Sequence, residues 1–172
     1  MDMRKFTEKS LTAVQGAQSL AKEYGNQEIG QLHLLHALVS DQDGLIRQLF
    51  IKMNKPAEAF EKAALAEIQK LPKVQGGEQY VSRALAESLE EAEKQMQKMG
   101  DSYVSVEHLF YGLYERADQK TKALFKTFGI ELNAFMQALA TVRGSRTVNS
   151  ENPEDTYDVL NKYGTDLVEK AR

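Results

Sequence analysis

The chain of 172 residues contains an internal repeat in which the second copy follows the first by 75 residues. Ile29–Val39 is repeated as Val104–Tyr114, which aligns His33 with His108. From 25 to 63 the alignment has no gap, and ten of its 39 positions are identical, against roughly two or three expected by chance. The repeat predicts two packed copies of one unit that share a core, with a seam where a ligand can bind. The identical pairs are Gly25/Gly100, His33/His108, Leu34/Leu109, Leu38/Leu113, Asp43/Asp118, Leu49/Leu124, Phe50/Phe125, Ala59/Ala134, Phe60/Phe135 and Ala63/Ala138.

Apolar residues recur at helical spacing throughout both copies, so the chain is predicted to be all-α. Thr7 is a good N-cap for the first helix, with Phe6 before it as a hydrophobic staple, and Gly25 is a good stop signal. No stretch of several residues alternates as a strand does. The expected fold is eight helices in two four-helix units: about 7–24, 31–39, 45–53 and 56–71, then about 82–99, 105–114, 119–128 and 132–142.

The predicted domain covers residues 1–142, with repeat one at 1–71 and repeat two at 79–142. Pro72–Gln79 is rich in turn residues and predicts a flexible joint between the copies. Residues 143–156 lack apolar periodicity and are predicted to be a flexible linker. Helical spacing returns at 157–172, which is too short for a domain, so we expect it to begin a following one.

Composition narrows the classes of function. The chain is 42% hydrophobic and 27% charged, with a net charge of −3, which is typical of a globular protein. Without a basic cluster, nucleic acid is not an expected partner. Because there is no cysteine, neither a disulfide framework nor a thiolate metal site is possible. No window resembles a signal peptide or a membrane span, and we expect a monomeric cytoplasmic protein.

No catalytic or metal-binding group is predicted. The chain has no G-x-x-x-x-G-K-[ST] phosphate loop and no G-x-S-x-G elbow, so we expect no enzyme activity and no cofactor in this chain. His33 and His108 lie near the first turns of their predicted helices, where capping or core packing explains them better than metal binding does. His36 has no repeat partner and is expected at the surface.

The doubled unit resembles the Clp amino-terminal domain, which precedes the ring-forming AAA+ ATPases. Ser105-Val-Glu-His-Leu109 matches the family pattern [ST]-x-E-H-L, whereas Gly30-Gln-Leu-His-Leu34 keeps only the His-Leu. Residues 142–148 and 160–172 are similar to the segment that, in the ClpB family of protein disaggregases, leads into the first nucleotide-binding domain.

This resemblance implies a substrate-engaging domain on a flexible tether. The full-length relative would be a homohexamer that uses ATP and magnesium, cooperates with the DnaK chaperone system, and threads unfolded or aggregated polypeptides through its pore. The alternative is an adaptor-docking domain of a ClpA- or ClpC-type protease unfoldase.

Three residues at predicted helix ends are candidate substrate-binding residues. Thr7 opens the first helix, Asp101 follows the fifth and Glu107 begins the sixth. In ClpB relatives, a threonine and two acids at the matching positions are implicated in chaperone activity and substrate handling. Capping and complementarity to the helix dipole are the alternative explanation.

A peptide groove is also expected in the second copy, on its long helix and the helix that follows. A shallow apolar surface suits clients of no fixed shape, because contact without deep pockets gives weak, reversible binding. Simple core packing is the alternative, above all for Leu89 and Leu109. The candidate groove residues are Leu85, Leu89, Val106, Leu109 and Phe110, and the candidate rim residues are Tyr80, Tyr103, Tyr111 and Tyr114.

Overall fold

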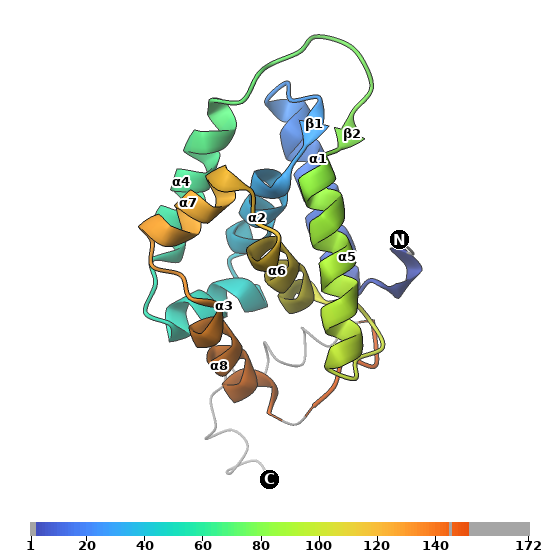
Figure 1. The fold of residues 1–172 in the computed structure, drawn as a ribbon, viewed down its shortest axis with the longest axis vertical. Coiled ribbons are helices and arrows are strands. Elements are labelled where there is room, and N and C mark those ends of the chain that lie inside the picture. Colours follow the sequence, from blue (N-terminus) through green and yellow to red (C-terminus); the bar gives the residue numbers. More distant parts are fainter. Residues whose placement is uncertain (1–2, 145, 152–172) are drawn as a thin grey trace.

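The computed structural model describes residues 3–144 and 146–151. Within these residues all eight predicted helices are present, each ending within two residues of its expected position (Figure 1). No described helix is both long and apolar enough to cross a bilayer. The elements are η1 (Met3–Lys5), α1 (Glu8–Glu23), β1 (Glu28–Ile29), α2 (Gln31–Ser40), α3 (Leu45–Lys52), α4 (Ala57–Gln69), β2 (Tyr80–Val81), α5 (Arg83–Lys98), α6 (Val106–Glu115), α7 (Gln119–Thr127) and α8 (Leu132–Arg143).

The first helix of each copy begins with an equivalent side-chain cap. The Thr7 hydroxyl accepts from the Ser10 amide at 3.1 Å, and the Ser82 hydroxyl accepts from the Leu85 amide at 3.0 Å. Each bond satisfies one of the amides that a helix start leaves unpaired. Since Thr7 and Ser82 are 75 residues apart, the repeat is preserved in local structure as well as in sequence.

Two short strands were not predicted. β1 and β2 are parallel, with Ile29 opposite Val81, and the Ser82 amide donates to the Ile29 carbonyl at 2.9 Å. Strands of two residues are too short to show an alternating pattern, so the sequence gives no strand signal here. In Figure 1 the chain from α4 arches over the end of the molecule to reach β2.

The repeat generates the same pairing at the other end of the molecule. Phe6 forms a parallel bridge with Val104, and the Thr7 amide donates to the Val104 carbonyl at 2.9 Å. Residues 5–7 and 80–82, here called the two arms, are 75 apart, as are Ile29 and Val104. Each copy therefore extends its arm to pair with the other copy.

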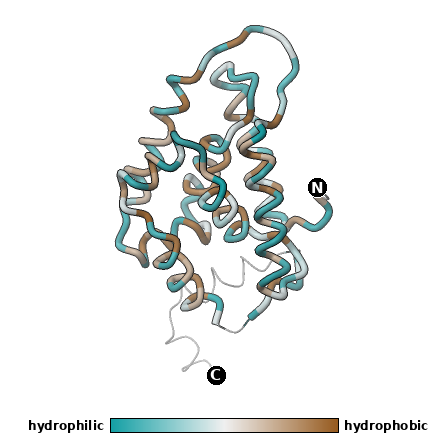
Figure 2. The backbone as a smooth tube through the Cα atoms, viewed as in Figure 1, coloured by the Kyte–Doolittle hydropathy of each residue, from teal (hydrophilic) through white to brown (hydrophobic). Residues whose placement is uncertain are grey.

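A cluster of six phenylalanines forms the centre of the core and joins the copies. Phe60 of the first copy stacks against Phe125 of the second, with ring centroids 6.0 Å apart. Phe50 makes an edge contact with Phe110 at 5.9 Å. Such pairs add to the stabilisation from burial alone. Figure 2 shows apolar and polar positions interleaved along the helices that surround this centre. The cluster comprises Phe50, Phe60, Phe110, Phe125, Phe128 and Phe135.

The two copies differ in how closely their first two helices pack. In the second copy, a Cβ atom added to Gly112 of α6 would overlap the Ser88 carbonyl oxygen of α5 and lie 3.1 Å from the Ala92 nitrogen. The equivalent residue of the first copy is Ala37, on α2. Its extra methyl group is compatible only with a wider separation of α1 and α2, so the first copy keeps an open groove there.

The expected linker from residue 143 is wrong for its first residues. Helix α8 includes Arg143, which is only 4% exposed, and Val148 is fully buried. The Val148 amide donates to Asp101 Oδ1 at 2.8 Å. A lone buried valine produces no periodicity, so the sequence pattern could not reveal this packing. The rest of the expected linker, residues 152–156, and residues 157–172, which were expected to begin a following domain, lie outside the described residues.

The contrast between the copies predicts opposite effects of two glycine-to-alanine substitutions. Gly112→Ala should destabilise the domain by about 1–3 kcal/mol, because the methyl group cannot fit against the α5 backbone. Gly16→Ala should stabilise it by about 0.5–1 kcal/mol, since its Cβ would lie 3.5 Å from Ala37 Cβ, an ordinary contact. Denaturant unfolding followed by circular dichroism measures both. Equal effects of the two substitutions would contradict the proposed difference in packing.

Candidate functional site

An apolar groove lies along the seam between the copies, where α1 of the first copy faces α5 and β2 of the second. It encloses about 230 Å³. Almost all of its lining is aliphatic or aromatic, and no charged side chain contributes to it. We call it the seam groove; its lining residues are Val14, Ala17, Gln18, Ile29, Leu34, Gln79, Tyr80, Val81, Leu85 and Leu89.

The exposed part of this groove comes from β2. Tyr80 is 52% exposed and Val81 is 48% exposed, which is unusual for two adjacent large apolar residues. Behind them the floor is formed by Leu85, which is buried, and by Leu89, which is partly buried. The Ser82 cap fixes the start of α5 and hence the direction of both leucines. The groove thus has a rigid floor and an apolar rim accessible to a partner.

The repeat explains why the seam groove is open. At the repeat-related place on the opposite side of the molecule, Phe6 stands where Val81 stands here. Phe6 is only 1% exposed, so its larger side chain is packed into the domain. The shorter Val81 remains at the surface beside the 230 Å³ space. The open groove therefore belongs to one side of the seam.

The backbone of β2 adds a second binding element. The Tyr80 amide donates to the Gln27 carbonyl at 3.0 Å and the Ser82 amide to the Ile29 carbonyl at 2.9 Å. Because backbone groups alternate in direction along a strand, the intervening Val81 amide and carbonyl point to the opposite edge. The Gln79 side chain, immediately before β2, donates to the Gln18 carbonyl of α1 at 3.3 Å and so ties the start of β2 to α1. An extended segment could add there while its side chains enter the groove.

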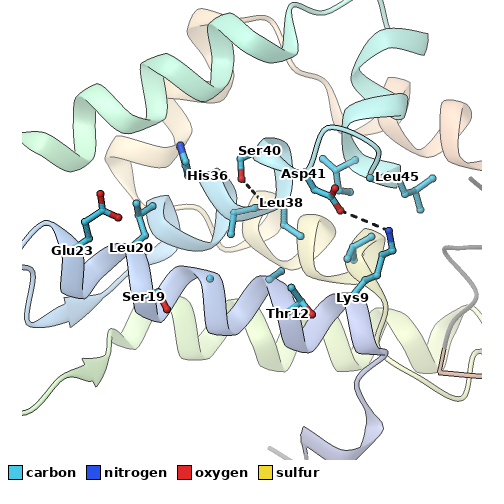
Figure 3. Close-up of a pocket in the computed structure, with 16 residues that line it drawn as sticks. Lys9, Thr12, Ser19, Leu20, Glu23, His36, Leu38, Ser40, Asp41 and Leu45 are labelled. Atoms are coloured by element: carbon cyan, nitrogen blue, oxygen red, sulfur yellow. Dashed lines mark hydrogen bonds and ion pairs between the residues drawn. The ribbon is translucent and has the colours of Figure 1, made fainter.

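A second, larger groove of about 570 Å³ lies between α1 and the α2–α3 region (Figure 3). Small residues, including Gly16, form its floor. Lys9 and Asp41 form an ion pair of 3.8 Å at one end, and Glu23 and His36 lie at the other. His36 was expected at the surface, but its side chain is only 14% exposed and its Nε2 lies 3.8 Å from a carboxylate oxygen of Glu61. This groove is more polar at its ends than the seam groove.

The predicted groove residues separate into three groups. Leu85 and Leu89 line the seam groove, and Val106 lines the α1–α2 groove. Leu109 and Phe110 are 1% and 0% exposed; they lie in the core and we leave them out of the proposed groove. Of the predicted rim tyrosines, Tyr80 lines the seam groove and is the most exposed, whereas Tyr103, Tyr111 and Tyr114 are partly buried.

Thr7, Asp101 and Glu107 are all buried, at 0%, 6% and 1% exposure. Arg143 connects the two acids: its guanidinium lies 2.6 and 3.1 Å from the Asp101 oxygens and 3.4 Å from Glu107 Oε2. Thr7 caps α1. Sequence reasoning missed Arg143, which had been assigned to the linker.

The carboxylate of Asp101 is held in its charged form. Burial alone would raise its pKa, but hydrogen bonds from His108, Arg143 and the Val148 amide, with the Arg143 charge, lower the pKa to about 2. Hydrogen bonds to the charged form have this effect on any carboxylate. Asp101 is thus a fixed anion that anchors three separate segments of the chain.

The two repeated histidines are capping residues, as predicted. Nδ1 of His33 accepts from the Gly30 amide at 2.9 Å, and Nδ1 of His108 accepts from the Ser105 amide at 2.9 Å. The ring proton therefore lies on Nε2, which donates to Asn26 in the first copy (2.9 Å) and to Asp101 in the second (2.7 Å). The described residues contain no group of three or more potential ligands that could hold a metal ion.

Residues 5–128 match the Clp repeat (R) N-terminal domain. The chain belongs to this family. The chaperone protein ClpB of Bacillus cereus is 41% identical over 177 aligned positions, which cover all of this chain and 20% of the relative. The chain thus corresponds to the N-terminal domain of a ClpB-type chaperone and spans about one fifth of such a relative.

Solved structures show the same fold. The N-terminal domain of Hsp104 from Candida albicans superposes with a TM-score of 0.78 at 26% identity, covering 87% of this chain and 99% of that one. A ClpV N-domain solved in complex with a VipB peptide gives a TM-score of 0.66 at 19% identity, covering 86% and 92% of the two chains. The Clp N-domain fold that the family resemblance implied is confirmed.

The buried histidine of the first copy predicts a pH dependence of stability. Burial lowers the pKa of His33 to about 4. The hydrogen bond with the Gly30 backbone raises this pKa and the His36 charge lowers it, but both effects are smaller than that of burial. An unfolded histidine titrates near 6.5, so as the pH falls the unfolded chain binds its proton first. Stability should therefore drop between pH 6.5 and 4, by up to about 3 kcal/mol from this group.

Denaturant unfolding at pH 7, 6, 5 and 4 tests this. Asp101 contributes only toward pH 4, where the unfolded carboxyl, whose ordinary pKa is 3.8, begins to bind protons that the folded one does not. His33→Gln should flatten the dependence whatever its cost at pH 7. His36→Gln, at a half-buried site, should change it less. An unchanged slope in His33→Gln would contradict the assignment.

Proposed function

We propose that this chain is the client-engaging domain of a ClpB-type disaggregase and that it binds unfolded polypeptides in the seam groove. The observation that carries the proposal is the exposed apolar rim of Tyr80 and Val81 over the buried floor of Leu85. An unfolded client offers apolar side chains and unpaired backbone groups, and the groove with its strand edge complements both.

The size and character of the groove favour weak binding. A space of about 230 Å³ accommodates one or two apolar side chains, and no buried charge fixes a particular sequence. Most of the gain on binding comes from apolar area, which is offset by the cost of ordering a flexible client. Weak binding to many sequences, with ready release, suits a domain that passes clients to a motor.

The relatives support this function without assigning it. A ClpV N-domain, of the same fold, has been solved with a peptide of VipB, so this architecture can hold a peptide. The hexameric ring, ATP and magnesium, and cooperation with the DnaK system would belong to the full-length protein, as in the ClpB family. A cytoplasmic location follows from the same proposal.

The alternative is docking of a folded adaptor, as in ClpA- or ClpC-type unfoldases. The α1–α2 groove favours it, because its ends carry charged groups, the Lys9–Asp41 pair at one end and Glu23 at the other. Charged groups at a rim give specificity for one partner more than affinity for many. Tight, one-to-one binding to a folded partner would support this alternative over the client-binding proposal.

Chemical-shift titration of the 172-residue chain with a permanently unfolded, cysteine-alkylated model protein tests the proposal. Shifts should centre on β2, the start of α5 and the facing side of α1. The double variant Tyr80→Ser/Val81→Ser should bind about tenfold more weakly, equivalent to about 1.4 kcal/mol, because it removes apolar area at exposed positions and leaves the fold intact.

Ile51→Ser is the matched control, since Ile51 on α3 is 66% exposed and does not line the groove. It should bind as the unmodified chain does. The proposal is wrong if millimolar client causes no shifts, or if the control weakens binding as much as the groove variant.

A further inference from the structure

Residues 146–151, which follow α8, run along the surface of the domain toward the start of α1. The Val148 amide donates to Asp101 Oδ1 at 2.8 Å, and the Val148 carbonyl accepts from the Ser102 amide at 2.6 Å. Further on, the Glu151 carbonyl accepts from the Glu8 amide at 3.0 Å. The segment thus pairs with two parts of the domain far apart in sequence.

Val148 is the only fully buried side chain among these six residues, while Thr147 and residues 149–151 are exposed. Before the segment begins, Arg143 holds the end of α8 on Asp101 through two hydrogen bonds. The Arg146 backbone oxygen also accepts from the Arg143 guanidinium at 2.9 Å. The Arg146 guanidinium in turn donates to the Arg143 and Val142 carbonyls at 2.9 and 2.6 Å. The attachment therefore has a strong base at the end of α8 and, beyond it, one buried apolar side chain and the backbone hydrogen bonds of Val148 and Glu151.

The repeat offers a direct comparison, because the chain leaving α4 follows the equivalent path. There the Asn26 side chain donates to the Pro72 carbonyl at 3.1 Å, and Asn26 is the repeat partner of Asp101. The Val74 amide donates to the Gly25 carbonyl at 2.9 Å. That connection is fixed at its far end by β2 and α5, which belong to the core. Residues 146–151 are held on the domain by the contacts with Asp101, Ser102 and Glu8.

We propose that residues 146–151 form a releasable latch that docks on Asp101, Ser102 and the start of α1. Undocking would leave Arg143 and the helices in place. It would lengthen the connection to whatever follows by about 20 Å, at about 3.3 Å per extended residue. It would also uncover one side of Asp101. The tether therefore has two lengths, a short one with the latch docked and a long one with it released. The seam groove can accordingly reach two different distances from whatever follows the domain.

The latch can be tested in the 172-residue chain without any client, so its outcome is independent of the proposed function. Because the chain has no cysteine, spin labels can be placed at Gln97→Cys on α5 and Ser150→Cys in the latch, both exposed positions. Val148→Asp should break the latch by placing a charge in an apolar site. Thr147→Asp introduces the same charge at the exposed neighbour and is the control.

In the labelled chain the distance distribution should be narrow. In Val148→Asp it should broaden and move to longer distances, whereas Thr147→Asp should match the unmodified chain. Amide exchange gives the second measurement. In Val148→Asp the Ser102 amide, whose acceptor is the Val148 carbonyl, should exchange at least tenfold faster. The Leu109 amide, which donates to Ser105 within the core, should be unchanged.

Three results would overturn the proposal. One is an identical distance distribution in Val148→Asp and Thr147→Asp, which would mean that Val148 does not hold the segment. Another is faster exchange of both Ser102 and Leu109 in Val148→Asp, which would make the segment an inseparable part of the fold. The third is equal protection of the two amides in the unmodified chain, since release would then require global unfolding.

Discussion

The reciprocal pairing of the two arms is the constraint on which the remaining structure depends. Residues 5–7 lie on Val104 of the second copy, and residues 80–82 lie on Ile29 of the first. These pairings fix where α1 and α5 begin, and both helices then run along the seam. The phenylalanine cluster fills the space enclosed between the copies. Neither copy can bury its apolar face without the other, so the two must form one cooperative core.

The functional features arise where the copies depart from their symmetry. A valine in place of Phe6 leaves the seam groove open on one side, and an alanine in place of Gly112 opens the α1–α2 groove. An aspartate in place of Asn26 attracts Arg143 and the latch. In each case a small change in volume or charge, at a position that the fold keeps fixed, creates a groove or a buried ion pair that the other copy lacks.

Sequence reasoning recovered the helices because caps, glycine stops and apolar periodicity are local signals. It also placed Leu85 and Leu89 on one face of α5, and both line the seam groove. It could not separate them from Leu109 and Phe110, because a helical stripe looks the same whether it faces a groove or the core. Only the tertiary arrangement determines which stripe is covered.

Long-range polar contacts were equally hidden from the sequence. Gln31 is buried at 2% exposure. Its side-chain amide donates to Ser88 Oγ at 2.9 Å and to the Arg116 carbonyl at 2.7 Å, while its oxygen accepts from the Asp118 amide at 2.9 Å. Its partners are more than fifty residues away, and no motif marks them. Arg143 is the same kind of case, since its role depends on where Asp101 lies in space.

The exchanged arms have a consequence for how such a chain can originate. A gene for one copy would produce a subunit with an unpaired arm and an unfilled core, and a second identical subunit would satisfy both. The geometry is that of a twofold homodimer in which each subunit contributes its arm to its neighbour. Fusing the subunits through residues 72–79 would make assembly independent of protein concentration. Each half could then diverge in sequence on its own, whereas in a symmetric homodimer every substitution appears in both subunits.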